Sequence, residues 1–401
     1  MYKKNIAFIT ITILLFSVTQ LFPIDPKTQK LATTNNDFGF RLFKEIVNNY
    51  ELQNVFISPA SIAMALAMTY NGASGETKKA MAKTLGIEDW GLQEFNEANL
   101  ALKNSLAKTD PKVTVKIANS LWTELGMKFK KDFIGRNKKY YGTKVTTIDM
   151  NAPRSPDVIN AWVKDNTNGK ITKIVDQIDG NTIMFLINAV YFNGKWQTEF
   201  DSALTQPRTF YCADGKELLH PMMYQDGEYL YLRDEKFQAV SLPYGKGQLS
   251  MYIFLPNKNS NLEEFLENLN EKNWSSWISR FTKTEGDITL PRFKLEYEKS
   301  LSEILKAMGM EVAFNADSAD FSNMCKISQF GEVYIGDVKH KTFVDVNEEG
   351  TEAAAITSVV MEIKGAPMYE FSMVVDHPFF CSIVDNKTGS ILFMGVITEP
   401  K

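Results

Sequence analysis

The sequence predicts an α+β protein in which helices pack against a large β-sheet. Three patterns support this prediction: apolar residues at helical spacing near the start of the chain, a helix-length segment that is apolar on all sides, and several later segments with the composition of strands. The 401 residues are 44% hydrophobic and 12% aromatic, which is enough to bury a large core.

The chain is expected to form one large domain over residues 24–401. Length alone favours two or three domains, but no Pro-, Gly- or Ser-rich linker, charge block or internal repeat divides the chain. The net charge of -4 is distributed along the sequence, which argues against nucleic-acid binding. The basic stretch Lys128 to Lys139 is either a solvated face or a site for a polyanion.

Residues 1–23 are expected to direct export, so that the protein is secreted. Lys3 and Lys4 precede an apolar run from Ile6 to Val18, which has the length of a signal-peptide core. The cleavage site is poor, so an uncleaved membrane anchor is the alternative. The chain has three cysteines, Cys212, Cys325 and Cys381. Three are too few for a disulfide framework, so the core alone must stabilise the exported fold.

Two helices are expected near the start of the domain. The first should begin after the capping candidates Asn36 and Asp37, because apolar residues from Phe38 to Val47 recur at helical spacing. Ser58 and Pro59 predict the start of the second helix, since proline is favoured at the first helical position. The following residues are apolar all round, so this helix should be buried on every side.

Strands are expected throughout the rest of the chain. Val113 to Ile117 alternates as a half-buried strand does, whereas Ile183 to Val190 is almost continuously apolar, as in a central strand covered on both faces. Three further strands are predicted over Leu249 to Leu255, Phe379 to Val384 and Ile391 to Ile397. A turn over Asp385 to Gly389 should join the last two into a hairpin.

The sequence lacks the common signatures of enzymes and of metal sites. Its three histidines are His220, His340 and His377. None has a metal-binding spacing, and there is no CxxC, GxSxG, Walker loop or GxGxxG. We therefore expect a protein that is not an enzyme and that needs no metal or cofactor, although a triad assembled from distant residues is the alternative.

The segment from Glu348 to Pro378 combines two unusual features. Gly350 to Ala355 is made of small residues with one glutamate among them, and Ile356 to Met361 is β-branched and apolar, like a buried strand. No proline interrupts it before Lys364, which lies beside Gly365 in a composition suited to an exposed turn. The segment predicts a latent strand followed by a bond that proteases can cleave. An ordinary surface loop is the alternative.

The latent strand sorts its residues onto two faces. Successive strand residues point to opposite sides of a sheet. If Thr351 faces the covered side, five uncharged residues do so as well: Ala353, Ala355, Thr357, Val359 and Met361. Glu352 and Glu362 then both lie on the outward face, as insertion into a covered sheet requires.

Five motifs along the chain resemble, in order, those of the serpins, a family of serine protease inhibitors. They are NVFISPASIAMAL (Asn54 to Leu66), INAVYFNGKW (Ile187 to Trp196), DVKHKTFVDVNEEGTEAAA (Asp337 to Ala355), HPFFCSI from His377, and LFMGVITEP from Leu392. The resemblance implies the serpin fold. This fold has a large central mixed β-sheet with further sheets, about eight to nine helices, and an exposed reactive-centre loop, here within residues 348–370.

The resemblance also assigns roles to particular residues. The hinge of the loop would consist of Glu348, Glu349, Gly350, Thr351, Glu352, Ala353, Ala354 and Ala355. A polar cluster beneath the place where the sheet opens, called the shutter, would contain Ser58, Ser61, Asn188 and His340. Trp196 would lie at the breach, where the sheet first parts. Four polar residues that are satisfied independently in the core are the alternative to the shutter.

The family's spacing places the reactive bond at Lys364-Gly365, and lysine suits the acidic pocket of trypsin-like proteases. The resemblance thus implies a monomeric suicide substrate that forms a covalent complex with such a protease. The alternatives are a non-inhibitory binding or chaperone protein, or an inhibitor of chymotrypsin-like, elastase-like or cysteine proteases. Asn273 and Asn386 fit the N-glycosylation pattern, which matters only in a cell that modifies it.

Overall fold

The computed structural model describes residues 25–48, 53–107, 110–178, 182–258, 260–325, 333–351 and 369–401. The predicted signal peptide or anchor, residues 1–23, lies outside these ranges. So do residues 352–368, which contain most of the predicted reactive-centre loop. Within the described ranges, no helix is long and apolar enough to cross a membrane.

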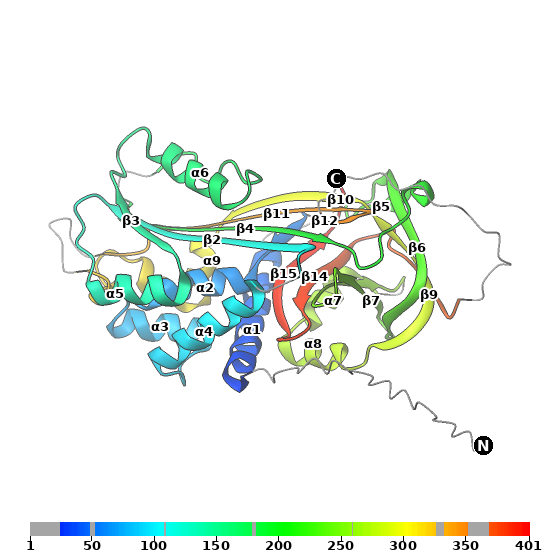
Figure 1. Cartoon of the computed structure of the whole chain (residues 1–401), viewed down its shortest axis with the longest axis horizontal. Helices are drawn as coiled ribbons and strands as arrows, with labels where there is room; N and C mark the ends of the chain where they lie inside the picture. The colour runs from blue at the N-terminus through cyan, green and yellow to red at the C-terminus, as the bar shows by residue number, and fades with distance from the viewer. Residues whose placement is uncertain are drawn as a thin grey trace, which may run out of the picture.

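Nine α-helices occur in the described parts of the chain, in agreement with the expected eight or nine. They are α1 (Pro26–Asn48), α2 (Pro59–Tyr70), α3 (Gly75–Leu85), α4 (Leu92–Ala107), α5 (Lys131–Arg136), α6 (Ser155–Asn166), α7 (Leu262–Asn268), α8 (Glu271–Ile278) and α9 (Ser302–Leu305). Helices α2 and α4 lie beneath a long sheet, and α6 covers its opposite face (Figure 1).

The long sheet has six strands and mixed pairing. In spatial order they are β10 (Phe293–Ser300), β11 (Asp337–Asn347), β12 (Gly350–Thr351), β4 (Met184–Lys195), β2 (Val113–Glu124) and β3 (Lys144–Ile148). Most neighbours are antiparallel, but β4 also pairs directly with β11 in parallel where β12 does not separate them. Strand β4 is central and buried along most of its length, as its apolar sequence predicted.

The remaining strands form a second, strongly bent sheet on the other side of the molecule (Figure 1). Along it lie β1 (Val55–Ile57), β15 (Ser390–Ile397), β14 (Phe379–Asp385), β8 (Leu249–Pro256), β7 (Phe237–Tyr244), β6 (Glu217–Arg233), β9 (Thr282–Pro291) and β13 (Phe371–Val374), with β5 (Gln206–Tyr211) pairing with β6. The predicted hairpin of the last two strands is confirmed as β14 and β15.

The second helix begins as predicted, and the first does not. Helix α2 starts at Pro59, and all of its residues are buried. Helix α1 starts at Pro26, so the expected caps Asn36 and Asp37 lie inside it. Asn36 is buried there because its side chain binds the β14–β15 turn: it donates to the Gly389 carbonyl at 2.8 Å and accepts from the Ile391 N–H at 2.9 Å.

Candidate functional site

The first two residues of the predicted insertion segment already lie in the long sheet. In β12, Gly350 pairs with Lys195 of β4 and Thr351 with Gly194, while β11 pairs with the other side of the segment. Gly350 has a φ of 146°, and a Cβ there would lie 2.1 Å from the Gly194 carbonyl oxygen. Only glycine therefore fits this position, where the chain turns from β11 back between the strands.

Thr351 points into the core. Its side chain is fully buried, and its hydroxyl lies 2.9 Å from the hydroxyl of Tyr244 on β7. The Tyr244 ring stacks on Trp196 with centroids 4.3 Å apart. The Trp196 indole N–H donates to the Asn347 carbonyl at 2.9 Å, and its backbone N–H donates to the Glu349 carbonyl. Trp196 therefore binds the backbone at the start of the hinge through both of its N–H groups, and its assignment to the breach stays a prediction.

Two glutamates hold the start of the hinge through charge. Glu348 is 7% exposed, and its carboxylate accepts from Arg292 at 2.7 Å and from the Thr205 hydroxyl at 2.5 Å. Glu349 pairs with Lys195 at 3.4 Å. A buried carboxylate with charged and neutral donors is well satisfied, and it would be costly to leave without its cation.

A row of polar side chains crosses the sheet below the hinge. Asn188 of β4 lies directly between Asn119 of β2 and His340 of β11. Its amide group donates to the Asn119 side chain and to the Ser61 hydroxyl, and its oxygen accepts from His340. The His340 Nε2 accepts from the backbone N–H of Ser58 at 3.2 Å. We call Ser58, Ser61, Asn119, Asn188 and His340 the polar row.

The polar row requires a neutral imidazole at His340. Its Nε2 is an acceptor and its Nδ1 a donor, so protonation of Nε2 would set two N–H groups against each other. Burial lowers the pKa of His340 to about 3, and the hydrogen bond with Asn188 offsets this effect only in part. Ser61, Asn188 and His340 are completely buried, so the hydrogen bonds among them are shielded from solvent.

The structure thus brings Ser61, Asn188 and His340 together, with Ser58 contributing its backbone rather than its hydroxyl. Sequence reasoning missed four contributors: Thr205, Asn119, Tyr244 and Arg292. A polar residue inside the β2 pattern was the signal for Asn119. The predicted hinge residues Glu352, Ala353, Ala354 and Ala355 and the predicted bond Lys364-Gly365 lie outside the described residues.

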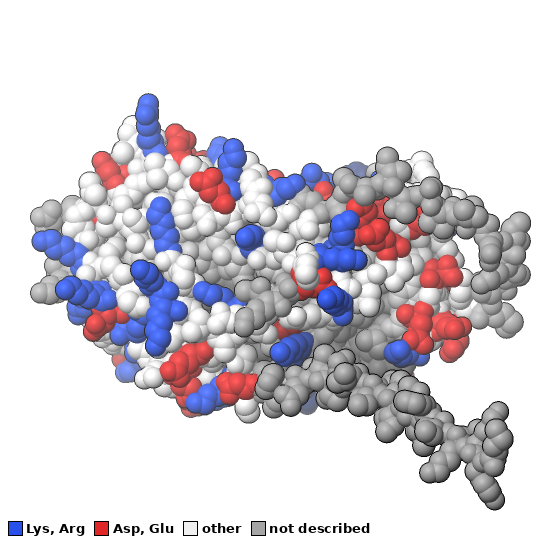
Figure 2. All heavy atoms as spheres, viewed as in Figure 1, with Lys and Arg blue, Asp and Glu red and all other residues white. Residues whose placement is uncertain are grey.

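The other predicted sites lie apart from the hinge. The lysines of Lys128 to Lys139 are exposed on and beside α5, at the end of the molecule where Figure 2 shows several basic side chains. Their role in binding a polyanion stays a prediction. Among the described residues, no group of three or more His, Cys, Asp or Glu could hold a metal ion.

Comparison with known proteins identifies the family. The family model of the serpins, serine protease inhibitors, matches residues 33–400. The chain belongs to the serpin family. Human Serpin B11 is 33% identical over 92% of the chain and 99% of its own length. The native thermophilic serpin tengpin is 34% identical and superimposes with a TM-score of 0.85, covering 92% of this chain and 94% of its own.

A third relative shows that the fold serves more than one purpose. Human thyroxine-binding globulin, solved in complex with thyroxine, is 26% identical and superimposes with a TM-score of 0.84, covering 94% of this chain and all of its own. Serpins are typically protease inhibitors rather than enzymes. The serpin fold predicted from the sequence is confirmed, with its mixed central sheet and helical layer.

Arg292→Ala should destabilise the protein by about 2 kcal/mol, because it leaves the buried Glu348 carboxylate without its cation. Denaturant unfolding followed by tryptophan fluorescence measures the loss. Arg280→Ala is the matched control: this arginine is similarly exposed but pairs with Asp234, a more accessible partner, and should lose only about 0.5 kcal/mol. Equal losses for both variants would contradict a special role of the buried pair.

Stability should fall with acid through His340. Its folded pKa of about 3 lies below its unfolded value of 6.5, so the unfolded chain binds the proton first. The contribution is complete above pH 6.5 and is lost at about 1.4 kcal/mol per pH unit as pH falls toward 3. The difference between wild type and His340→Gln in unfolding free energy against pH isolates this effect, with His220→Gln as the control. A difference that does not change with pH would refute it.

Proposed function

We propose that this serpin inhibits trypsin-like serine proteases as a suicide substrate, by inserting its cleaved reactive loop into the long sheet. The observation that carries the proposal is the position of β12 between two strands that are still paired with each other further along. Export of the protein, which such a target suggests, is part of the same proposal and rests on residues 1–23.

The register of β12 defines a path for insertion. Gly350 pairs with Lys195 and Thr351 with Gly194, so each further residue would move one position back along β4. On its other side, Thr351 pairs with Val346 of β11. Six residues further along the inserted strand, Thr357 would therefore lie between Asn188 of β4 and His340 of β11. Ten residues on, Met361 would reach Met184, the first residue of β4.

Insertion would replace one parallel ladder with two antiparallel ladders. At present Asp337 to Phe343 pairs in parallel with Phe185 to Tyr191. An inserted strand would separate these segments and run antiparallel to both. Parallel pairing is slightly less stable per residue, and each new ladder bond contributes on the order of 1 kcal/mol net. The inserted state is therefore expected to be the more stable one, which leaves the intact inhibitor kinetically trapped.

The faces of the inserted strand agree with this path. Thr351 faces the core, which was the condition for the sorting of residues predicted from the sequence. Ala353, Ala355, Thr357, Val359 and Met361 would then face the core, and Glu352 would face outward. Thr357 would enter the polar row between Asn188 and His340, and its hydroxyl can replace one hydrogen bond that the insertion breaks.

The chemistry belongs to the protease. Its serine attacks the carbonyl carbon of Lys364, the amine of Gly365 leaves, and Lys364 stays attached as an ester. The freed segment beyond Thr351 then inserts. A strand from Thr351 to Lys364 would span roughly 46 Å, so the attached protease would be carried over a distance of that scale. The inserting strand pulls on the ester and displaces its carbonyl oxygen from the oxyanion-hole donors of the protease. Loss of one such donor typically lowers the rate of the acyl-transfer step by about 10²–10³-fold. Hydrolysis of the ester therefore stalls.

Incubation with trypsin tests the proposal directly. We expect a band near the summed masses on a denaturing gel, resistant to boiling, and a released peptide that begins at Gly365. Lys364→Ala should abolish this complex without changing thermal stability. Cleavage without a complex would instead favour a binding protein, and unchanged trapping by Lys364→Ala would move the bond to a neighbour such as Met361 or Ile363.

Thr351→Arg tests insertion separately from recognition. An arginine at position 351 would be buried beside Tyr244, so residue 351 should leave the sheet, insertion from there should be slowed, and the variant should be cleaved as a substrate. Ala354→Arg carries the same charge on the outward face and should still trap trypsin. The ratio of complex to cleaved inhibitor measures both variants. If Thr351→Arg traps as well as Ala354→Arg does, the proposed path is wrong.

A further inference from the structure

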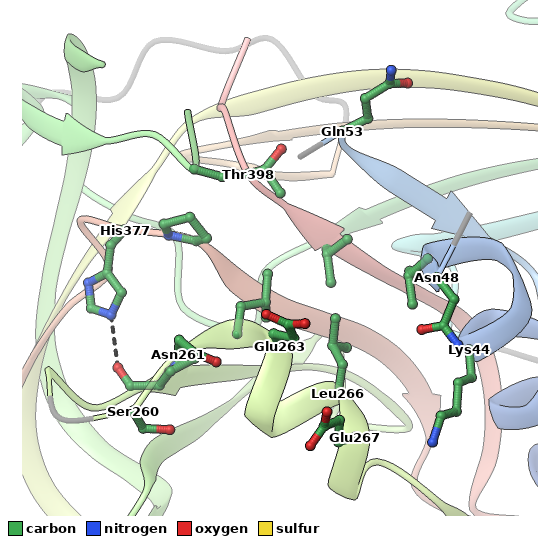
Figure 3. Close-up of a pocket in the computed structure, with 16 residues that line it drawn as sticks. Lys44, Asn48, Gln53, Ser260, Asn261, Glu263, Leu266, Glu267, His377 and Thr398 are labelled. Carbon is green, nitrogen blue, oxygen red and sulfur yellow. Dashed lines mark hydrogen bonds between the residues drawn. The ribbon is translucent and has the colours of Figure 1, made fainter. Parts of the chain in front are cut away.

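A cavity of about 700 Å³ lies on the side of the molecule where α1 ends. Its walls are the last turn of α1, helix α7, the end of β15 and the His377-Pro378 connection that leads into β14 (Figure 3). None of its lining residues belongs to the hinge or the polar row. The volume lies within the range of sites that hold small organic molecules.

The floor of the cavity is apolar. Apolar residues from two helices, two strands and two connections line it: Val47, Ala213, Pro256, Leu262, Leu266, Pro378 and Val396. Several of these are only partly buried, so the cavity exposes apolar surface to solvent. A ligand with an apolar body would remove this surface from water, at a gain of free energy that grows with the area covered.

The rim of the cavity carries excess negative charge. Glu263 and Glu267 lie one turn apart on α7, where like charges repel, and neither forms an ion pair within the described parts of the chain. Lys44 stands across from them on α1, with Asn48 beside it (Figure 3). A ligand cation placed at the two carboxylates would relieve the repulsion, and an acceptor at its other end would suit Lys44 and Asn48.

His377 lines the cavity, but both of its ring nitrogens are already bound within the protein. Its Nε2 lies 2.8 Å from the Pro256 carbonyl and its Nδ1 lies 2.7 Å from the Asp376 carboxylate. Both partners are acceptors, so both ring nitrogens donate and the imidazolium is favoured. Asp376 neutralises that charge within the protein, and Lys258 lies near His377 without lining the cavity. Among the residues that line the cavity, the remaining charges are therefore the carboxylates of Glu263 and Glu267 and the ammonium group of Lys44.

We infer that this cavity binds an apolar organic amine, with its ammonium group at Glu263 and Glu267, its body on the apolar floor and a hydrogen-bond acceptor toward Lys44 and Asn48. Occupation of the cavity does not depend on protease inhibition.

Two fluorescent probes of similar size test the inference. Dansylcadaverine has a naphthalene body, a sulfonamide acceptor and a terminal ammonium, whereas dansyl-6-aminohexanoate ends in a carboxylate. At physiological ionic strength the amine should bind with brightened fluorescence and about fivefold more tightly than the carboxylate, because the rim charges are exposed and act through solvent. Absence of saturable binding, or equal affinity for both probes, would overturn the inference.

Variants locate the probe. The Glu263→Gln/Glu267→Gln protein should bind the amine about fivefold more weakly and lose the preference for it. Glu264→Gln removes one charge from the same helix outside the cavity, where Glu264 pairs with Lys236, and should leave binding unchanged. Leu266→Arg, confirmed as folded by circular dichroism, should block the cavity. Binding that survives Leu266→Arg would mean that the probe lies elsewhere, and the inference would fail.

Discussion

Strands β4 and β11 must stay paired in the intact protein and yet separate when a third strand enters between them. In the described structure β12, Gly350–Thr351, separates the two strands at one end only, and β4 and β11 pair directly further along. Gly350 allows β12 to approach the backbone of β4 more closely than a residue with a side chain could. The Arg292–Glu348 pair and the Trp196–Tyr244 stack fix the hinge in this position. The sheet is thus open for two residues and closed below them.

Hydrogen bonds suit the closing of the sheet better than apolar packing does. The bonds of Asn188 to Asn119, Ser61 and His340 are directional, so they specify one register of three strands, and they cost free energy when broken without replacement. Apolar side chains at the same positions would pack similarly well in several registers of the three strands. A polar row also accepts a replacement partner, since an incoming hydroxyl can restore the hydrogen bonds of the separated strands. The same groups can therefore keep the sheet closed and later stabilise it with a strand inserted.

Much of the fold could be predicted from local patterns, because those patterns report burial. The all-apolar helix after Ser58 and the closing hairpin are examples. Helix α1 was misjudged because Asn36 looks like a cap in sequence, whereas its partners at Gly389 and Ile391 are distant in the chain. Asn119, Tyr244 and Arg292 were missed for the same reason: their roles depend on partners that only the folded sheet brings near. The resemblance to serpins located the hinge in the sequence. The pairing of Gly350 and Thr351 between β4 and β11 became known only from the structure.

Helix α2 connects the closed sheet to the helical layer. Its start contacts the polar row, where the Ser58 N–H donates to His340 and Ser61 binds Asn188. Just beyond its end, Asn71 forms a reciprocal pair of amide hydrogen bonds with Asn96 of α4. Both contacts are buried, so the helix cannot shift at one end without loss of hydrogen bonds at the other. Separation of β4 from β11 therefore has to break the bonds to α2 or move α2 together with α4. The barrier that keeps the sheet closed thus includes the packing of the helices as well as the pairing of the strands.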